Sequence, residues 1–349
     1  MSERSPGSWP SVVCLGELLI DLVAVGPDQT IDGATSFRKA PGGAPANVAV
    51  GLARLGMPAG FIGKVSSDAF GRFLRTTLEA DGVDVRGLVA DPKARTPLAF
   101  VGSDGTRRRS WIFYHRGMAD TLLQPEEVDA ELIRHARAFH FGSVSLAAEP
   151  GRSATLAGAR IARDGGCLVS FDPNVRLELW DSPRDAHDTI LSALQSADVV
   201  KVSGDETQFL FGTDDPSEAC RAIRSVGPTL AIVTLGADGS YFQTASAEGH
   251  VAGFAVAAVD ATGAGDAFVA CLLSELVAAG ATPDITHDEE ALSAAIKFAN
   301  AGGALATTAY GAIPSLPTRR EVQALIDRSA RADGPRSTTT AADVQVGTR

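Results

Sequence analysis

The sequence predicts a three-layer α/β/α fold with a mostly parallel central sheet, accompanied by a small separate β-sheet. Two observations carry this prediction. After Tyr114, short apolar runs typical of buried strands alternate with segments of helical period. This is the pattern of right-handed βαβ units, whose helices cover both faces of a sheet. Before that point a hairpin pattern interrupts the alternation and indicates strands that lie outside the main body.

The N-terminal third predicts a strand, an extended segment and two helices around a short second strand. An apolar run at 12–16 predicts a buried strand, and residues 21–39 predict extended chain with turns because they carry glycine and proline without a helical period. Residues 45–55 predict a helix, with Pro45 in its first turn and Gly56 at its C-terminal cap. The other two elements are a strand at 61–63 and a helix at 70–78.

A candidate lid is predicted by two strands that flank a tight turn. Residues 98–101 and 111–114 are apolar runs on either side of Asp104 and Gly105, a pair that favours a hairpin. Together with the earlier extended segment they predict a small sheet, whose closure over a ligand would exclude water. The lid would comprise residues of about 21–39 and 95–116.

The rest of the chain alternates strands and helices. The expected parallel strands lie at 139–141, 168–171, 199–202 and 230–235. Helices are expected at 130–136, 154–163, 186–195, 217–226, 265–279 and 291–308. Two further strands, at 241–243 and 254–259, are expected to pair antiparallel near one edge. We therefore expect one domain over residues 10–328 and a disordered tail over 329–349, because the tail has no apolar period.

Composition and charge narrow the class of partner. The chain has 349 residues, of which 45% are hydrophobic and 21% charged, as in an ordinary globular protein. Its formal net charge of −11 disfavours nucleic acid and anionic membranes as partners. The charge does not exclude ATP, because phosphate sites are built locally from backbone N–H groups and a few cations.

Cysteines and the N-terminus predict a cytoplasmic protein. None of the four cysteines forms a CxxC pair, so a zinc knuckle or redox motif is not indicated, and we expect buried, reduced thiols. The first ten residues contain no apolar signal-peptide core. No apolar stretch is long enough to cross a bilayer.

The stretch DATGAGDAF at 260–268 places small residues where a strand is expected to give way to an amphipathic helix. Gly263, Ala264 and Gly265 allow consecutive N–H groups to point into one concave space. At a helix N-terminus these donors are unpaired and carry partial positive charge, so the turn suits a phosphate. Asp266 follows in the first helical turn. It is either a helix-capping carboxylate or a general base beside a phosphate, and this motif alone leaves both open.

The stretch PGGAPANVA at 41–49 places two glycines before the first predicted helix. Gly42 and Gly43 allow the backbone to pass close to a ligand. Asn47 can both donate and accept hydrogen bonds, which suits a polyol. The alternative is an ordinary turn and helix start with Asn47 in solvent.

Together the two stretches resemble the two signatures of the ribokinase-like (PfkB-type) carbohydrate kinases, and most closely the fructokinase branch. The resemblance covers residues 12–317 and includes, in the family's order, the segments 16–17, 172–176 and 234–236. One departure is Ala261, where the family has Thr or Ser. The resemblance implies a ribokinase-like fold and ATP-dependent phosphorylation of a sugar hydroxyl, namely fructose to fructose 6-phosphate. It also implies a homodimer formed through the lid.

The resemblance assigns roles to individual residues. Asp266 would deprotonate the sugar hydroxyl, and the backbone of Gly263, Ala264 and Gly265 would form the anion hole. The residues implied to meet the sugar are Asp21, Gly42, Gly43 and Asn47, and Arg176 would reach substrate and phosphates unless it forms a surface ion pair with Glu178 or Asp181.

Nucleotide and cation positions are implied in the same way. Glu206 would help to hold Mg²⁺ through water, while Ser203 stands where the family has Asn. Residues 60–65 do not make a Walker A sequence, so ATP would be held by a different route. The nucleotide-side residues are Lys201, Glu206, Thr234, Gly236, Gly239 and Asn300. The positions that bind a monovalent cation such as K⁺ in some relatives are Asp260, Thr262, Ala306, Gly311 and Ser315.

Three alternatives are weighed against this interpretation. A 2-keto-3-deoxygluconate kinase would need a cation for the acid group, which Arg116 or one of the arginines at 107–109 could supply, although those three are also typical of a solvated hairpin tip. A sugar-binding regulator without catalysis would have no need of Asp266. A dinucleotide-dependent oxidoreductase is disfavoured, because Gly16 is not followed by the Gly-x-Gly-x-x-Gly fingerprint. His115 and His140 are expected to be structural.

Overall fold

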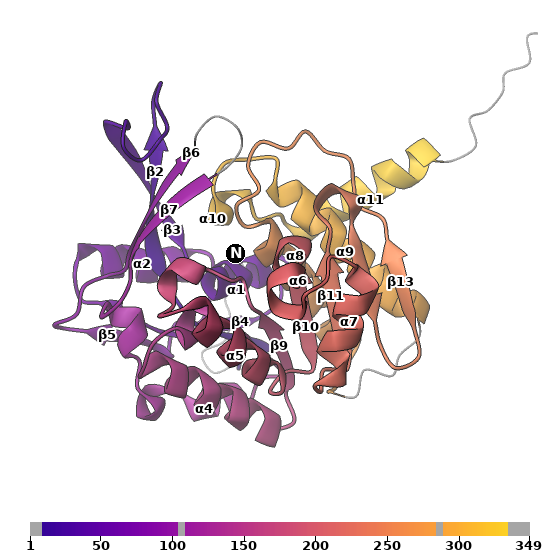
Figure 1. The fold of residues 1–349 in the computed structure, drawn as a ribbon, viewed down its shortest axis with the longest axis horizontal. Coiled ribbons are helices and arrows are strands. Elements are labelled where there is room, and N and C mark those ends of the chain that lie inside the picture. The colour runs from indigo at the N-terminus through magenta and orange to yellow at the C-terminus, as the bar shows by residue number, and fades with distance from the viewer. Residues whose placement is uncertain (1–8, 104–108, 284–288, 334–349) are drawn as a thin grey trace, which may run out of the picture.

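A nine-stranded sheet forms the centre of the protein, in a computed structural model that describes residues 9–103, 109–283 and 289–333 (Figure 1). Its strand order is β13-β12-β11-β10-β9-β8-β1-β4-β5, and every neighbouring pair from β11 to β5 is parallel, whereas β12 and β13 pair antiparallel. The strands are β1 (Val12–Leu15), β4 (Ala59–Ser66), β5 (Leu88–Asp91), β8 (Ala138–Gly142), β9 (Leu168–Asp172), β10 (Val199–Ser203), β11 (Leu230–Thr234), β12 (Ser240–Gln243) and β13 (Glu248–Val251).

Helices cover both faces of this sheet and create two separate cores. Alternate residues of β1 point to opposite faces, so Val12 and Cys14 enter one core while Val13 and Leu15 enter the other. The first core includes residues of α1 (Ala44–Arg54), α2 (Ala69–Ala80), α8 (Ala264–Ala278), α9 (Glu289–Ala306) and α11 (Arg319–Asp333). The second includes residues of α3 (Ala130–Arg134), α4 (Gly151–Asp164), α5 (Pro183–Leu194), α6 (Gly204–Phe211) and α7 (Pro216–Ser225). The predicted three-layer fold is confirmed.

A second sheet of four strands stands apart from the main body at the upper left of Figure 1. Its order is β3-β2-β6-β7, with β2 (Leu19–Val25), β3 (Ser36–Gly42), β6 (Leu98–Ser103) and β7 (Arg109–Tyr114). Trp111 and Phe113 stack on one face, and Phe37, Phe100 and Tyr114 form edge contacts on the other. The predicted lid strands are thus confirmed, while the turn at Asp104 and Gly105 lies outside the described residues.

Three predictions about single elements are wrong. Residues 254–259 are not a strand; this segment is irregular, and the N–H groups of Val259 and Asp260 donate to the carbonyl of Thr307 rather than to the sheet. The second antiparallel strand is instead β13, a polar edge strand. Helix α8 forms where it was predicted but is not amphipathic: it has no polar face, because it packs between α1 and α9 and is buried almost throughout. Residues 329–333 are helical, since α11 runs to Asp333; the rest of the tail is not described.

Other features agree with the sequence. All four cysteines are buried and unpaired. His140 is buried beside Ser170 (Nδ1 to Oγ, 3.1 Å), and burial lowers the pKa of His140 to about 3, so it is a neutral structural residue. In the described ranges, no helix is both long and apolar enough to span a bilayer.

Candidate active site

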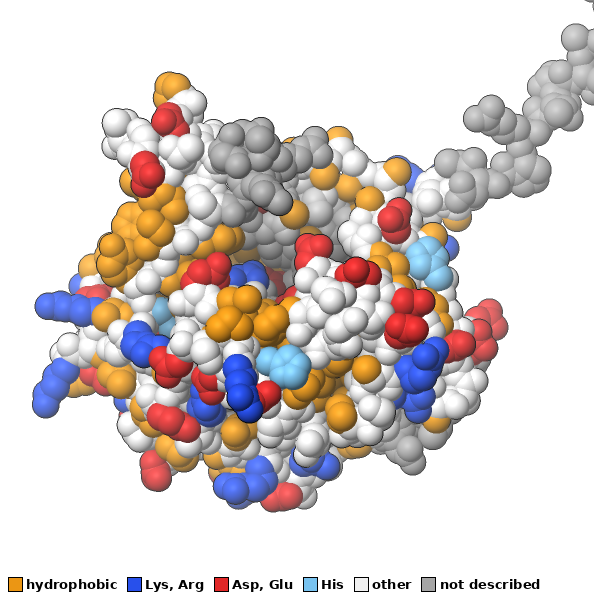
Figure 2. Space-filling model, viewed as in Figure 1, with side chains coloured by type: hydrophobic (Ala, Val, Ile, Leu, Met, Phe, Trp, Pro, Cys, Tyr) orange, Lys and Arg blue, Asp and Glu red, His pale blue; other side chains and the backbone are white. Residues whose placement is uncertain are grey.

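The candidate active site lies where the carboxyl ends of parallel strands meet the N-terminus of α8. β9 ends at Asp172, β10 carries Lys201, and the first turn of α8 carries Asp266. In α/β folds this edge of the sheet is where ligands bind. A space-filling view shows a hollow between the lid sheet and the main body (Figure 2).

The turn before α8 has the geometry of an anion site. Gly263 has φ of 82°, and a Cβ atom there would lie 2.8 Å from Cα of Ala312, so only glycine fits. The N–H of Ala264 closes the turn by donating to the carbonyl of Ala261 at 3.2 Å. The N–H of Gly265 follows in the first turn, where helical amides have no acceptor within their own helix. This donor therefore suits a bound anion better than that of Ala264.

Asp266 is held in place by Asn47, which lies far away in the sequence. Asn47 Nδ2 donates to Asp266 Oδ2 at 2.8 Å, and Asp266 is only 8% exposed. Burial raises the pKa of Asp266 to about 6; the bond from Asn47 opposes this rise, nearby Asp172 adds to it, and Lys201 and Arg176 also oppose it. The carboxylate is therefore a stronger base than an ordinary aspartate, yet it is mostly ionised at neutral pH.

Lys201 supplies a fixed positive charge beside the turn. Its Nζ lies 3.0 Å from Asp172 Oδ2, and also 3.0 Å from where a Cβ on Gly265 would stand. Burial alone would lower the pKa of Lys201, but Asp172, Glu206 and Asp266 outweigh it and raise the pKa above its usual value. The predicted nucleotide-side lysine therefore stands at the anion turn.

Glu206 has a structural role in addition to the predicted role in holding Mg²⁺. Its Oε1 accepts from the N–H of Val175 at 2.6 Å, and its Oε2 accepts from both N–H and Oγ of Ser203 at 2.8 Å, which caps helix α6. No group of three or more His, Cys, Asp or Glu side chains in the described part of the chain could hold a metal ion. Mg²⁺ that arrives on nucleotide phosphates, with one carboxylate reached through water, fits such a site.

The predicted sugar-side residues lie on the lid strands and beside them. Asp21 on β2 faces β3 so closely that a Cβ on Gly42 would lie 2.4 Å from its carboxylate oxygen. Arg176 donates to the carbonyl of Val175 at 2.9 Å, and its guanidinium lies 6.0 Å from the ring centre of Trp111 on the lid. Asp181, which the sequence offered as an ion-pair partner of Arg176, pairs with Arg116 instead.

The ion pair between Arg116 and Asp181 has a length of 2.5 Å, and both of its side chains are exposed. Arg116 is therefore engaged at the surface and does not stand ready for an acidic sugar. Arg107, Arg108 and the side chain of Arg109 lie outside the part of the chain that the structure describes.

The remaining predicted residues fall into two groups. Thr234, Gly236 and Gly239 lie at the end of β11 and in the turn that follows it, and Asn300 Nδ2 ties α9 to the end of β13 by donating to the carbonyl of Val251 at 2.9 Å. Three of the predicted cation residues are joined by hydrogen bonds: Asp260 accepts from the N–H and Oγ of Thr262 and from the N–H of Gly311. Ser315 donates to the carbonyl of Ala312, and Ala306 is buried at the end of α9.

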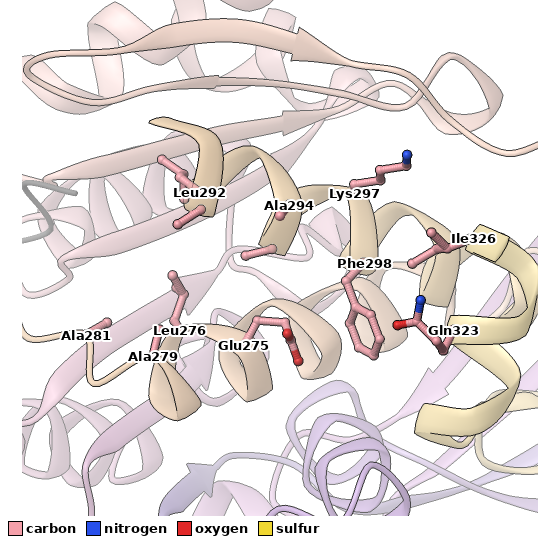
Figure 3. A pocket seen from close by; sticks show the side chains of 12 residues that line it. Glu275, Leu276, Ala279, Ala281, Leu292, Ala294, Lys297, Phe298, Gln323 and Ile326 are labelled. Atoms are coloured by element: carbon pink, nitrogen blue, oxygen red, sulfur yellow. The ribbon is translucent and has the colours of Figure 1, made fainter. Parts of the chain in front are cut away.

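A cavity of about 460 Å³ lies elsewhere, between α8, α9 and α11 (Figure 3). Its walls are largely apolar, with Leu276, Leu292, Phe298 and Ile326 among them. The described residues that line it include no anion turn and no buried carboxylate pair, so we do not place the active site there.

The sequence analysis gave no functional role to several residues that the fold brings to the site or to the segments that join the lid to the body. The sequence could have indicated Asp172 as a site residue, because it is a polar residue at the end of a buried strand, where ligands bind in α/β folds. Glu17 lies far from His115 and Asp120 in the sequence, and no pattern in the sequence links it to them.

Comparisons with known proteins agree with this geometry. Residues 10–319 match the pfkB family carbohydrate kinase. Over 320 residues the chain is 47% identical to Fructokinase-1 of Zea mays, covering 91% of this chain and 98% of that relative. The fructokinase with bound ATP from Xylella fastidiosa has a TM-score of 0.84 at 35% identity, covering 91% of this chain and 98% of that one.

A second solved structure is the fructokinase of Vibrio cholerae O395 in a form with fructose, ADP and calcium ion bound. Its TM-score is 0.81 at 38% identity, and the match covers 90% of this chain and 98% of that one. A double mutant of the same protein has potassium ion bound. With a family match over nearly the whole chain and relatives at this level of identity, the chain belongs to the pfkB family of carbohydrate kinases.

Proposed function

We propose that this protein is an ATP-dependent fructokinase that forms fructose 6-phosphate. One observation carries the proposal: a buried carboxylate, Asp266, is held by Asn47 in the first turn of a helix that begins with an anion turn. Phosphoryl transfer needs a base and preorganised positive charge in that arrangement. The names of the relatives, which are fructokinases, support fructose as the acceptor.

The reaction follows from these positions. Asp266 takes the proton of the sugar hydroxyl as the hydroxyl oxygen forms its bond to the γ-phosphorus, and the bond to the β,γ-bridging oxygen breaks so that ADP leaves with the electron pair. The amides of the 263–265 turn, chiefly that of Gly265, stabilise the charge on the transferring group. Lys201 adds positive charge at the same place. Mg²⁺ carried by the nucleotide would neutralise phosphate charge, with Glu206 as its carboxylate partner through water.

Binding of the two substrates is assigned to opposite sides of this turn. On the sugar side, the hydroxyls would meet Asp21, the backbone of Gly42 and Gly43, and Asn47, while Arg176 reaches across from below the lid. The nucleotide side is assigned to Thr234, Gly236, Gly239 and Asn300. A monovalent cation such as K⁺ would bind among the loops of Asp260, Thr262, Ala306, Gly311 and Ser315, which pack against the anion turn through Gly263 and Ala312.

The pH dependence of the reaction should report Asp266. Only the ionised carboxylate can accept a proton, and the pKa of Asp266 is raised to about 6. Values of kcat/KM for the sugar are therefore expected to fall as pH drops through 6, by about tenfold per unit below it. A steady-state pH profile with fructose checks this, and a flat profile between pH 7 and pH 5 would contradict it.

The lid also offers a dimer contact. Ile112 and Tyr114 on its outer face are 45% and 58% exposed, next to Phe37 and Phe100. We assign this apolar face to a homodimer interface. Tyr114→Glu is then expected to yield a monomer in sedimentation velocity, because it places a charge in the apolar contact. Leu156→Glu on α4, which is also partly exposed, is the matched control and should leave the dimer intact; dissociation in both variants or in neither would contradict the assignment.

The choice of sugar is tested by measuring ADP release with fructose, 2-keto-3-deoxygluconate and ribose. Fructose should give the largest kcat/KM, because the cation that an acidic sugar needs is not offered by Arg116, which is paired with Asp181. If no sugar raised ADP release while one sugar still bound, the protein would be a sugar-binding regulator. A cytoplasmic location stays a prediction from the sequence.

A further inference from the structure

A buried cluster of charged side chains lies where the lid joins the body. Glu17, His115 and Asp120 are 3%, 5% and 7% exposed. His115 Nε2 lies 2.6 Å from Asp120 Oδ2, and the charge of Glu17 interacts with both partners. The phosphoryl-transfer chemistry proposed above uses none of the three.

The cluster occupies the lid's hinge. Glu17 lies between β1 and β2, two residues before the lid sheet begins at Leu19, and His115 directly follows Tyr114, where β7 leaves the sheet. The third lid connection passes nearby, since the N–H of Ala119 donates to the carbonyl of Arg95 at 2.9 Å. The chain therefore enters and leaves the lid through this cluster.

Asp120 ties the cluster to the main body. It belongs to the short 3₁₀ helix η1 (Ala119–Leu122). Lys64 on β4 donates to the carbonyl of Leu122 at 3.2 Å and pairs with Glu127, so the end of η1 is fixed to the central sheet. The ion pair between His115 and Asp120 thus joins a residue of the lid's exit to a residue fixed on the body.

Glu17 joins the same cluster to the sugar-binding turn. Helix α1 begins after Gly43, which has no side chain to cap the helix, and Glu17 Oε1 supplies the missing acceptor for the N–H of Ala44 at 2.7 Å. Four residues further along the chain from Gly43, Asn47 holds Asp266. A displacement of Glu17 would therefore move both the sugar-binding backbone and the side chain that orients the base.

A purely structural core gains little from such a cluster. Glu17 Oε2 and Asp120 Oδ1 are buried, and neither has a hydrogen-bond partner among the described residues. Buried carboxylate oxygens without partners destabilise a fold, whereas apolar side chains of similar size would not. In agreement, burial, and then repulsion from Asp120, raise the pKa of Glu17 to about 7.

We propose that Glu17, His115 and Asp120 are positioning residues that couple the lid to the sugar-binding turn, so that the turn and Asn47 reach their working position when the lid is in place. The kinetic part of this proposal rests on the proposed kinase function. The coupling itself concerns the free protein and can be measured without any sugar.

Kinetics test the first part with Glu17→Ala, Glu17→Gln and His115→Gln. We expect the KM for fructose to rise about tenfold or more in Glu17→Ala and His115→Gln, with the KM for ATP little changed. Glu17→Gln should lie between these variants and the wild type, because its amide oxygen can still accept from Ala44. Asp181→Asn is the matched control, since it breaks an exposed ion pair with the residue next to His115 and should leave both KM values unchanged.

Hydrogen–deuterium exchange of the free protein tests the second part. His115→Gln and Asp120→Asn should speed exchange at least about fivefold in the peptide that contains Ala44, whereas Asp181→Asn should not. Unchanged exchange there would overturn the coupling. Equal increases of both KM values in step with a lowered Tm would also overturn it, since they would indicate general destabilisation. If wild-type protein released no ADP with any sugar, the proposed function would fail while the exchange experiment still decided the coupling.

Discussion

Asp266→Asn is expected to lower kcat by at least about a hundredfold while the KM for fructose changes little. The amide cannot accept the hydroxyl proton, but it keeps the size of the carboxylate and can still accept the bond from Asn47. Steady-state kinetics of ADP release with fructose give both constants.

The stability of this variant provides its control. Because the folded state raises the pKa of Asp266 to about 6, the protein binds this proton more tightly when folded, and stability falls as pH rises from the ordinary aspartate range to 6. At pH 7 the buried charge therefore opposes folding, and the uncharged Asp266→Asn variant should have a Tm equal to or above that of the wild type. Near-normal turnover in a well-folded variant would remove Asp266 from the role of base.

Gly263→Ala is expected to lower kcat by about a hundredfold through loss of the anion turn. A methyl group there would lie 2.8 Å from the backbone of Ala312, so the turn has to move. Its N–H groups would then no longer point at the phosphate. Removing one such donor from an anion hole costs about 10²–10³ in rate. Kinetics at saturating ATP and fructose measure the effect.

Gly56→Ala is the matched control for this substitution. Gly56 has φ of 84°, almost the same as Gly263, but no atom lies within 4 Å of the place where its Cβ would stand. It should therefore show only the cost of a left-handed alanine, about 1–2 kcal/mol of stability, with kcat unchanged. If both variants lost activity to the same degree, backbone strain rather than the anion turn would be the cause.

The regular part of the fold was accessible from the sequence because local patterns determine it. Strands such as β8 and β9 are short, wholly buried and separated by helices with one apolar face. Helix α8 lacks that face, since neighbours surround it, and residues 254–259 are apolar without being a strand. In these segments tertiary packing decides which residues are buried and whether a strand forms, and periodicity does not show either.

The candidate site also has a part that the sequence predicts and a part that it does not. The two glycine-containing stretches are each contiguous in the chain, and the structure brings them together through the bond from Asn47 to Asp266. The Lys201–Asp172 pair depends on β9 and β10 lying side by side, and the hinge cluster depends on two segments, one with Glu17 and one with His115 and Asp120, that meet only after folding. A single sequence contains no local trace of such contacts.

The most direct test of this account is a crystal structure with fructose, ADP and aluminium fluoride, which imitates the phosphoryl group in transfer. We predict that the fluoride complex lies against the amides of the 263–265 turn, with a fructose hydroxyl within about 3.2 Å of an Asp266 carboxylate oxygen. A fluoride complex bound away from this turn, or a hydroxyl approached by a different base, would contradict the account.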